Sequence, residues 1–296
     1  MFNWRKNNNI LRHLLLLSGL VILPVLISGC AVIVKKAGNS FSGSLTEVIL
    51  NHNDLATVRE AMPAYMLLMD SFIRRHPESV QTYTTAATLY SAYAGLIPAD
   101  DEARAERLSD KAMDYAFKAL CLEEEGLCQV NDMPFETYET RLEDASLDTS
   151  LLFTVASTWA GWVQTNKSDW NAVAQLPKAK AMMEKVLQQD ETYSDGQGHM
   201  YMGVLESLVP PAAGGDLEKA KRHFEKASTI ADGENLMAKV LYAKNYARMM
   251  FDKELHQKLL NEVLEADPEA ENLTLMNMAA QKRAEKLQES AQDYFE

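Results

Sequence analysis

The sequence predicts an all-α protein built from stacked antiparallel helical hairpins. Residues that favour helices, namely Ala, Leu, Met, Glu, Lys and Gln, are abundant along the 296-residue chain. Long stretches of alternating apolar and polar residues, which are typical of half-buried strands, are missing. Proline, glycine and acidic residues separate the helical segments at short intervals, and short loops make successive helices antiparallel. We therefore expect almost no strand.

The predicted helices begin and end at residues that favour helix boundaries. The segments HPES (76–79), LIPADD (96–101), VPPAAGGD (209–216) and ADPEAE (266–271) combine proline or glycine with acidic or hydroxyl N-cap residues. The segment 121–148 is expected to be an enlarged loop or an insertion. The expected helices are residues 45–52, 55–75, 79–95, 101–122, 147–165, 176–190, 197–209, 216–230, 234–250, 253–266 and 272–292.

A weak internal repeat supports the helical hairpins. Ala220, Phe224 and Ala227, followed by Asp232, have the spacing of the second helix of a tetratricopeptide repeat. Central positions of the matching rows are 67, 41 and 36 residues apart, and only the last value approaches the period of about 34 residues. The sequence thus predicts a degenerate tetratricopeptide-like array, an α–α superhelix, although burial alone produces similar rows in any amphipathic helix. The other three rows are Ala112, Ala116 and Ala119; Ala179, Met183 and Val186; and His256, Leu260 and Val263.

The N-terminal segment has the features of an export signal. Three basic residues precede an apolar run, residues 14–27. This run is short for a membrane helix, because about 20 apolar residues are needed to cross a bilayer core. The run ends in ISGC (27–30), the pattern of a bacterial lipobox. We predict that Cys30 is acylated and becomes the N-terminus, and the alternative is an uncleaved signal anchor that extends through Val34.

The chain is therefore predicted to have three parts. Residues 1–29 form a lipoprotein signal peptide, residues 30–43 a lipidated N-terminus and linker, and residues 44–296 the helical domain. Acyl chains would hold the exported protein on a membrane, because each buried methylene contributes about 0.8 kcal/mol. Ala31, rather than aspartate, follows the cysteine, and in this the chain resembles Gram-negative lipoproteins of the outer membrane, although the residue does not indicate which face. The localisation that we expect is the periplasmic face of the outer membrane.

The charge of the chain argues against nucleic acid as a partner. The formal net charge is −13, and the loss of the three basic signal residues leaves 26 basic and 42 acidic residues, a charge of −16. Such a surface repels phosphate backbones.

Two cysteines remain besides Cys30. Cys121 and Cys128 have six residues between them, in a segment that contains Gly126 and turns from a helix into a loop. An exported protein meets an oxidising compartment, so the pair can form a disulfide, and the alternative is two reduced, partly buried thiols.

Aromatic residues recur at helical spacing in two segments. Trp159 and Trp162 are three positions apart, as are Tyr90 and Tyr93, so each pair lies on one side of a helix. Such rows usually belong to a core. An aromatic ring with a polar tip also suits a groove for a peptide or an apolar ligand, and we keep these four residues as candidate groove-lining residues.

Common catalytic motifs are not found in the sequence. A phosphate-binding G-x-x-x-x-G-K loop, H-E-x-x-H, G-x-S-x-G and S-x-x-K are all missing, and no two histidines have ligand spacing on one helix. The GGD element (214–216) is interpreted as a turn whose aspartate caps the next helix, with a binding role for His223 as the alternative. We predict no catalytic activity, no cofactor and no metal.

Three segments carry a resemblance to a known family. LATVREAMPAYMLLMDSFIRRHPESVQTYTTAATLYSAYAG (55–95), VLQQDETYSDGQGHMYMGVL (186–205) and GGDLEKAKRHFEKA (214–227) resemble the T component associated with TRAP transporters, the TatT family. The resemblance extends from about Gly43 to Leu287. It implies a periplasmic lipoprotein with tetratricopeptide-like repeats that associates with a TRAP substrate-binding protein. It also implies a homotrimer with a cleft or pore for hydrophobic small molecules, and it supplies no catalytic residue.

The function expected from the sequence is therefore that of a lipid-anchored accessory subunit of a TRAP-type transporter. Such a subunit would dock a substrate-binding protein and bind an apolar ligand. The alternative is a general envelope scaffold whose tetratricopeptide-like hairpins hold a peptide or an assembly partner. An enzyme is the third class considered, and it would need a catalytic pair that the fold brings together.

Overall fold

The computed structural model describes residues 47–98 and 101–296, and within these ranges the secondary structure is helical with no strand. This confirms the all-α prediction. The finer tetratricopeptide-like description stays a prediction. The predicted signal peptide, Cys30 and most of the linker lie outside the described residues. Within the described part of the chain, no helix has both the length and the apolar character that a membrane span requires.

The chain divides into two units, Met1–Leu50 and Asn51–Glu296. Residues 47–50 of the first unit are helical. The second unit contains α2 (Leu55–Arg75), α3 (Val80–Ala94), α4 (Glu102–Glu123), α5 (Phe135–Asp144), α6 (Thr149–Thr165), α7 (Trp170–Val173), α8 (Leu176–Gln189), α9 (Tyr193–Ser207), α10 (Leu217–Ile230), α11 (Leu236–Tyr242), α12 (Lys253–Glu265), α13 (Thr274–Glu289) and α14 (Ala291–Phe295). A π-helical segment, Ala243–Ala247, follows α11 directly, and two 3-10 turns are Glu125–Leu127 and Pro211–Ala213.

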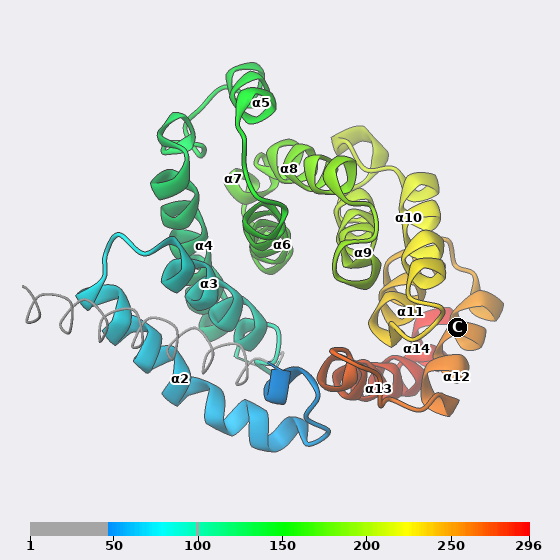
Figure 1. Ribbon diagram of the computed structural model, residues 1–296. Coiled ribbons are helices and arrows are strands. Elements are labelled where there is room, and N and C mark those ends of the chain that lie inside the picture. Colours follow the sequence, from blue (N-terminus) through cyan, green and yellow to red (C-terminus); the bar gives the residue numbers. More distant parts are fainter. Residues whose placement is uncertain (1–46, 99–100) are drawn as a thin grey trace, which may run out of the picture. The chain divides into compact units, whose positions relative to one another are not determined.

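Helices of the second unit pack mainly on their neighbours in the sequence (Figure 1). The helix α3 packs between α2 and α4, α6 packs on α4 and α8, and α9 packs on α8 and α10. In the last part, α11 and α12 both pack on α13. This order of contacts follows from the short connections that the sequence predicts.

Side-chain caps define many helix starts. Asp54, Ser79, Asp148, Asp216 and Asp252 each accept a hydrogen bond from a backbone N–H in the first turn of the helix that follows. Each cap satisfies a backbone donor that has no partner within the helix. The predicted boundaries at 79 and 216 therefore lie at real N-caps.

The four repeat-like rows all face the interior. The twelve apolar or histidine side chains of these rows have at most 1% of their surface exposed. Burial of an i, i+4, i+7 row is what an amphipathic helix requires, so the finding explains the rows without deciding whether they form true repeats.

Two apolar cores meet at α9. Met202 and Leu205 belong to a core formed mainly by α3 to α8, whereas Met200 and Val204 belong to a core formed by α10 to α13. Tyr201 packs against both cores. The helix α9 is therefore the element that joins the two cores.

The segment 121–148 contains a helix that the sequence did not predict. The helix α5 begins after Pro134 and packs on α8 through Tyr138, whose hydroxyl donates to the backbone oxygen of Lys178 at 3.0 Å. A disulfide joins Cys121 and Cys128, whose Cα atoms are 4.2 Å apart. The short helix α7 was also not predicted.

Two other boundaries differ from the prediction. Residues 234–250 were expected to form one helix, but α11 passes into the π-helical segment and then a turn in which Phe251 has a φ of 56°. The start of α9 is interrupted at residues 194–196, which adopt left-handed φ values, so the regular part begins near the predicted position 197.

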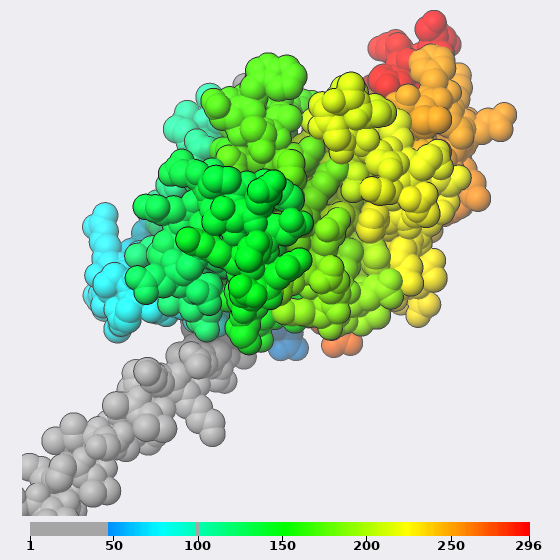
Figure 2. Space-filling view, turned by 90° about the horizontal axis from the view of Figure 1, so that it is seen from above, coloured from blue at the N-terminus to red at the C-terminus, as the bar shows by residue number. Residues whose placement is uncertain are grey.

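The first and last parts of the second unit lie side by side. Asn53 Nδ2 donates to Glu269 Oε1 at 3.2 Å, and Arg283 Nη2 donates to the backbone oxygen of Gly95 at 2.9 Å. At the C-terminus, Phe295 packs on His256 and Phe251. Figure 2 shows the red C-terminal end of the chain beside orange residues.

Candidate functional site

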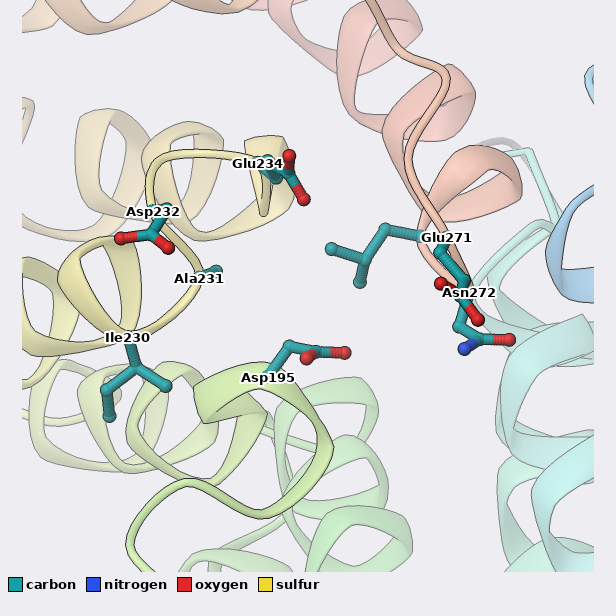
Figure 3. A pocket seen from close by; sticks show the side chains of 8 residues that line it. Asp195, Ile230, Ala231, Asp232, Glu234, Glu271 and Asn272 are labelled. Atoms are coloured by element: carbon teal, nitrogen blue, oxygen red, sulfur yellow. The ribbon is translucent and has the colours of Figure 1, made fainter.

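A pocket of about 260 Å³ lies where the starts of α9, α11 and α13 approach the end of α10. Asp195, Asp232, Glu234 and Glu271 contribute four carboxylates to its lining, and Asn272 contributes an amide. Figure 3 shows these side chains around a common space, together with Ile230 and Ala231. Leu273 is the remaining lining residue.

The backbone around this pocket is unusual. Asp195, Asp232 and Asn272 have φ values of 55°, 49° and 61°, in the left-handed region. Asp and Asn tolerate this region better than other side chains, because they can form local hydrogen bonds. The loops that carry the carboxylates therefore turn sharply at the pocket.

The pocket is suited to a polar or cationic group rather than an apolar one. Its four carboxylates repel an anion and would lose hydration against a hydrocarbon. No group of three or more His, Cys, Asp or Glu in the described residues is arranged to hold a metal ion.

The candidate groove residues Tyr90 and Tyr93 are buried, with 4% and 7% of their surface exposed. The Tyr90 hydroxyl donates to Asp70 Oδ2 at 2.9 Å, and Lys111 Nζ donates to the same carboxylate oxygen at 2.6 Å. Burial opposes ionisation of Asp70, but hydrogen bonds from Lys111, Tyr115 and Tyr90 lower its pKa below the ordinary value. This network fastens α2 to α3 and α4, so the phenol of Tyr90 has a structural role.

The candidate groove residue Trp159 is fully buried, and its ring packs against Phe117 and Tyr138 at centroid distances of 4.8 and 6.0 Å. Trp162 is half-buried and its Nε1 donates to Asp110 Oδ1 at 2.7 Å. None of the four aromatic residues lines the acidic pocket. The structure therefore places Trp159 in the core, which is the alternative that the sequence left open.

A histidine pair links α9 and α10. The Nδ1 atoms of His199 and His223 are 2.8 Å apart, so one ring donates a hydrogen bond and the other accepts it. Burial, and then the charge of His199, lower the pKa of His223 to about 4. The two residues are 24 positions apart on different helices, and for this reason helical spacing did not reveal the pair.

The GGD turn has the role that its sequence predicts. Gly214 has a φ of 93°, and a Cβ atom on Gly215 would lie 1.7 Å from the backbone oxygen of Val209. Asp216 Oδ1 accepts from the backbone N–H of Lys219 at 3.0 Å and caps α10. The two glycines are therefore required by backbone conformation and close packing.

Two groups of apolar side chains are exposed on the second unit. The first lies on α2 and consists of Leu67, Leu68 and Phe72, of which Leu67 is 68% exposed. The second consists of Met249, Met250, Phe251 and Tyr294. Methionine and aromatic residues are enriched at protein interfaces, so both groups are candidate positions of contact with another protein.

Comparison with models of known protein families finds a match over most of the chain. The family model described as TRAP transporter T-component matches residues 51–295, nearly the whole second unit. No curated protein matches the chain at a significant level.

Proposed function

Because the chain belongs to the TRAP transporter T-component family, we propose that it is a lipid-anchored subunit that docks a periplasmic substrate-binding protein. Membership by itself implies an accessory role at a TRAP transporter, and it suggests a non-enzyme. The match over residues 51–295 is the observation that carries the proposal. The lipobox at Cys30 supports the anchor, and an exported, periplasmic location follows from it.

The ligand and the assembly are finer parts of the proposal. A homotrimer and an apolar ligand are what the family resemblance implies. The acidic pocket does not supply an apolar lining, so an apolar ligand would have to bind elsewhere on the molecule.

Docking is tested by photo-cross-linking in native membranes. A photoreactive amino acid is placed at Phe251 in one variant and at Leu67 in another, and cross-linked proteins are identified by mass spectrometry. A third variant carries the label at Lys118, an exposed polar position on α4. Recovery of a periplasmic substrate-binding protein from either apolar position, but not from Lys118, supports docking and locates its surface.

Other outcomes of this experiment contradict the proposal. If only envelope assembly factors are captured, the general scaffold function is favoured over transport. If the three positions capture the same proteins to the same extent, contact is non-specific.

The anchor is tested by labelling cells with radioactive palmitate. Cys30→Ser should lose the label and leave the membrane fraction, whereas Cys128→Ser should keep both. Retention of label by Cys30→Ser would exclude acylation at this residue.

Alkylation of the unreduced protein before mass spectrometry also tests the disulfide, because Cys121 and Cys128 should stay unmodified if the bond forms in the exported protein.

A further inference from the structure

The helix α2 lies on the outer side of α3 (Figure 1). Its main contacts are with α3, and it contacts α13 to a smaller extent. The side of α2 that packs inward carries Val58, Met62 and Met66, which are buried. These residues are four positions apart and form one row along the helix. The opposite side of α2 therefore faces away from its neighbours.

This outward side of α2 is apolar over more than two turns. Leu67 is 68% exposed, and Leu68 and Phe72 are each 39% exposed. Ala64, four positions before Leu68, is also exposed. Helical residues three or four positions apart are neighbours, so Ala64, Leu67, Leu68 and Phe72 form one surface, which we call the α2 patch. Exposed apolar patches of this kind mark contact with a protein or with a membrane.

Two cations lie at the C-terminal end of the α2 patch. Arg74 and Arg75 belong to the last turn of α2, and both are exposed. Neither guanidinium forms a hydrogen bond or an ion pair with the described residues. The next acidic residue in the sequence is Glu78, so this end of the helix keeps a net positive charge.

Negative charge is scarce around the α2 patch, although the chain as a whole has 42 acidic and 29 basic residues. The helix α2 contains two acids, of which Asp70 is paired with Lys111 Nζ at 2.6 Å. The other, Glu60, lies in the first half of the helix, away from the two arginines. The helix α3, on which α2 packs, contains no charged residue. The patch and its arginines are therefore complementary to an apolar surface that carries negative charge.

The position of α2 in the chain favours a membrane as the partner. Leu55, the first residue of α2, follows the predicted acylated Cys30 by 25 positions, and a chain of this length spans at most about 85 Å. A bilayer that holds the anchor is therefore within reach of α2. Tethering also gives the second contact a high effective concentration, so a weak contact is populated.

We propose that the α2 patch rests on an anionic phospholipid bilayer. Leu67, Leu68 and Phe72 would lie at the boundary between headgroups and acyl chains, with Arg74 and Arg75 against lipid phosphates. Helices with leucine and phenylalanine on one face and basic residues beside it lie in the membrane interface in this way. Arginine suits this position, because its apolar stem stays at the acyl chains while its charge reaches the headgroups.

The inference rests on the lipid anchor of the proposed function and goes beyond it. An acyl anchor alone leaves the orientation of the helical domain on the membrane open, whereas contact through α2 fixes it. The α2 patch is then occupied by lipid, and the exposed group around Phe251 remains for a partner protein. In the cross-linking experiment, a substrate-binding protein should therefore be captured from Phe251 and not from Leu67.

The test measures lipid contact in the full-length, acylated protein, reconstituted in vesicles of phosphatidylethanolamine and phosphatidylglycerol. An environment-sensitive dye is attached to Ser71→Cys, because Ser71 is exposed beside Leu67 and Phe72 and its replacement keeps the apolar side chains. Lys258→Cys, exposed on α12, carries the dye in the control. Nitroxide-labelled lipids should quench the dye at position 71 and shift its emission to shorter wavelength, and should leave the dye at position 258 unaffected.

The role of the arginines is tested in the same vesicles. Arg74→Gln combined with Arg75→Gln should weaken the lipid-contacting state about 25-fold, because each cation at an anionic surface contributes about a factor of five. Lys253→Gln combined with Lys258→Gln removes the same charge from exposed positions on α12 and should leave quenching at position 71 unchanged. Vesicles of phosphatidylcholine alone should reduce quenching of the unsubstituted arginine protein in the same way.

Three outcomes would overturn the proposal. The first is absence of lipid quenching at position 71, and the second is equal quenching at positions 71 and 258. The third is an emission shift at position 71 without quenching by nitroxide lipids, which would show that protein covers the patch. Palmitate labelling and sedimentation with vesicles are measured separately for each variant, so failure of the α2 contact and failure of the anchor are distinguishable.

Discussion

Buried polar contacts determine the hydrogen bonding and the pKa of individual side chains in this protein, and His256 is an example. Its side chain is fully buried on α12, and its Nε2 accepts from Arg248 Nε at 3.0 Å. The proton of the neutral ring is therefore on Nδ1. Burial, followed by the positive charge of Arg248, lowers the pKa of His256 to about 4.

This pKa predicts a loss of stability in acid. A histidine has a pKa of about 6.5 in an unfolded chain, so the unfolded state takes up the proton first as the pH falls. The contribution of His256 is complete above about pH 6.5 and is lost as the pH falls toward about 4, by up to about 3 kcal/mol. His256→Gln keeps an acceptor for Arg248 but does not titrate, so its free energy of unfolding should fall less over this window.

Urea unfolding at pH 7 and pH 4.5 measures the difference. His76→Gln is the matched control, because His76 is exposed. If the free energy of unfolding of His256→Gln fell between pH 7 and pH 4.5 by as much as that of the wild type, this account would be contradicted.

In the candidate sites, contacts between residues that are far apart in the sequence were not predicted. The Nδ1 atoms of His199 and His223 are 2.8 Å apart, yet the two residues are 24 positions apart in the sequence, which exceeds any helical spacing. Asp216 was predicted correctly because a cap depends on residues three positions away.

Among the elements, the long helices were predicted, whereas the short helices α5 and α7 were not. The helices α2, α3 and α10 begin and end within one residue of their predicted bounds. The helix α5 has only ten residues and only two buried side chains, Tyr138 and Leu142. The sequence of such a short helix cannot be told from that of a loop with two apolar residues. The helix forms because tertiary contacts with α8 stabilise it.

One of those contacts gives a prediction. Lys185 Nζ on α8 donates to the backbone oxygens of Leu142, Glu143 and Ala145 at the end of α5. Lys185→Met leaves these carbonyls without a charged donor, and we expect a loss of about 1–3 kcal/mol in the free energy of unfolding. Hydrogen exchange of the α5 amides should also become faster. Lys118→Met, at an exposed position whose side chain makes no hydrogen bond or ion pair with the described residues, should change neither quantity.

The contact of α9 with α10 gives a second prediction at this scale. A Cβ atom on Gly203 would lie 2.7 Å from the ring of Phe224. Gly203→Ala should therefore destabilise the protein by about 1–3 kcal/mol, despite the higher helix propensity of alanine. Gly161→Ala is the control, because its Cβ would make an ordinary contact at 3.4 Å with Ser91 Oγ. Equal thermal stability of the two variants would show that the helices can move apart at no cost.

At the scale of the whole second unit, α9 determines whether the two cores fold together. Its alternate residues enter different cores, because Met202 and Leu205 pack on one side and Met200 and Val204 on the other. Loss of either core would expose half of α9. Two cores that share a central helix should therefore unfold in one transition.

Phe224→Ala tests this coupling. Phe224 is fully buried in the core of α10 to α13, and its removal should cost about 3–5 kcal/mol. Trp159, Trp162 and Trp170 all lie outside that core. Trp4 belongs to the predicted signal peptide and is lost from the mature protein, so tryptophan fluorescence of the mature protein reports on the other core, whereas circular dichroism reports on all helices. Because α9 transmits the loss, both signals should shift to the same lower urea concentration. A fluorescence transition that stays at its original midpoint would mean that the two cores are independent folding units.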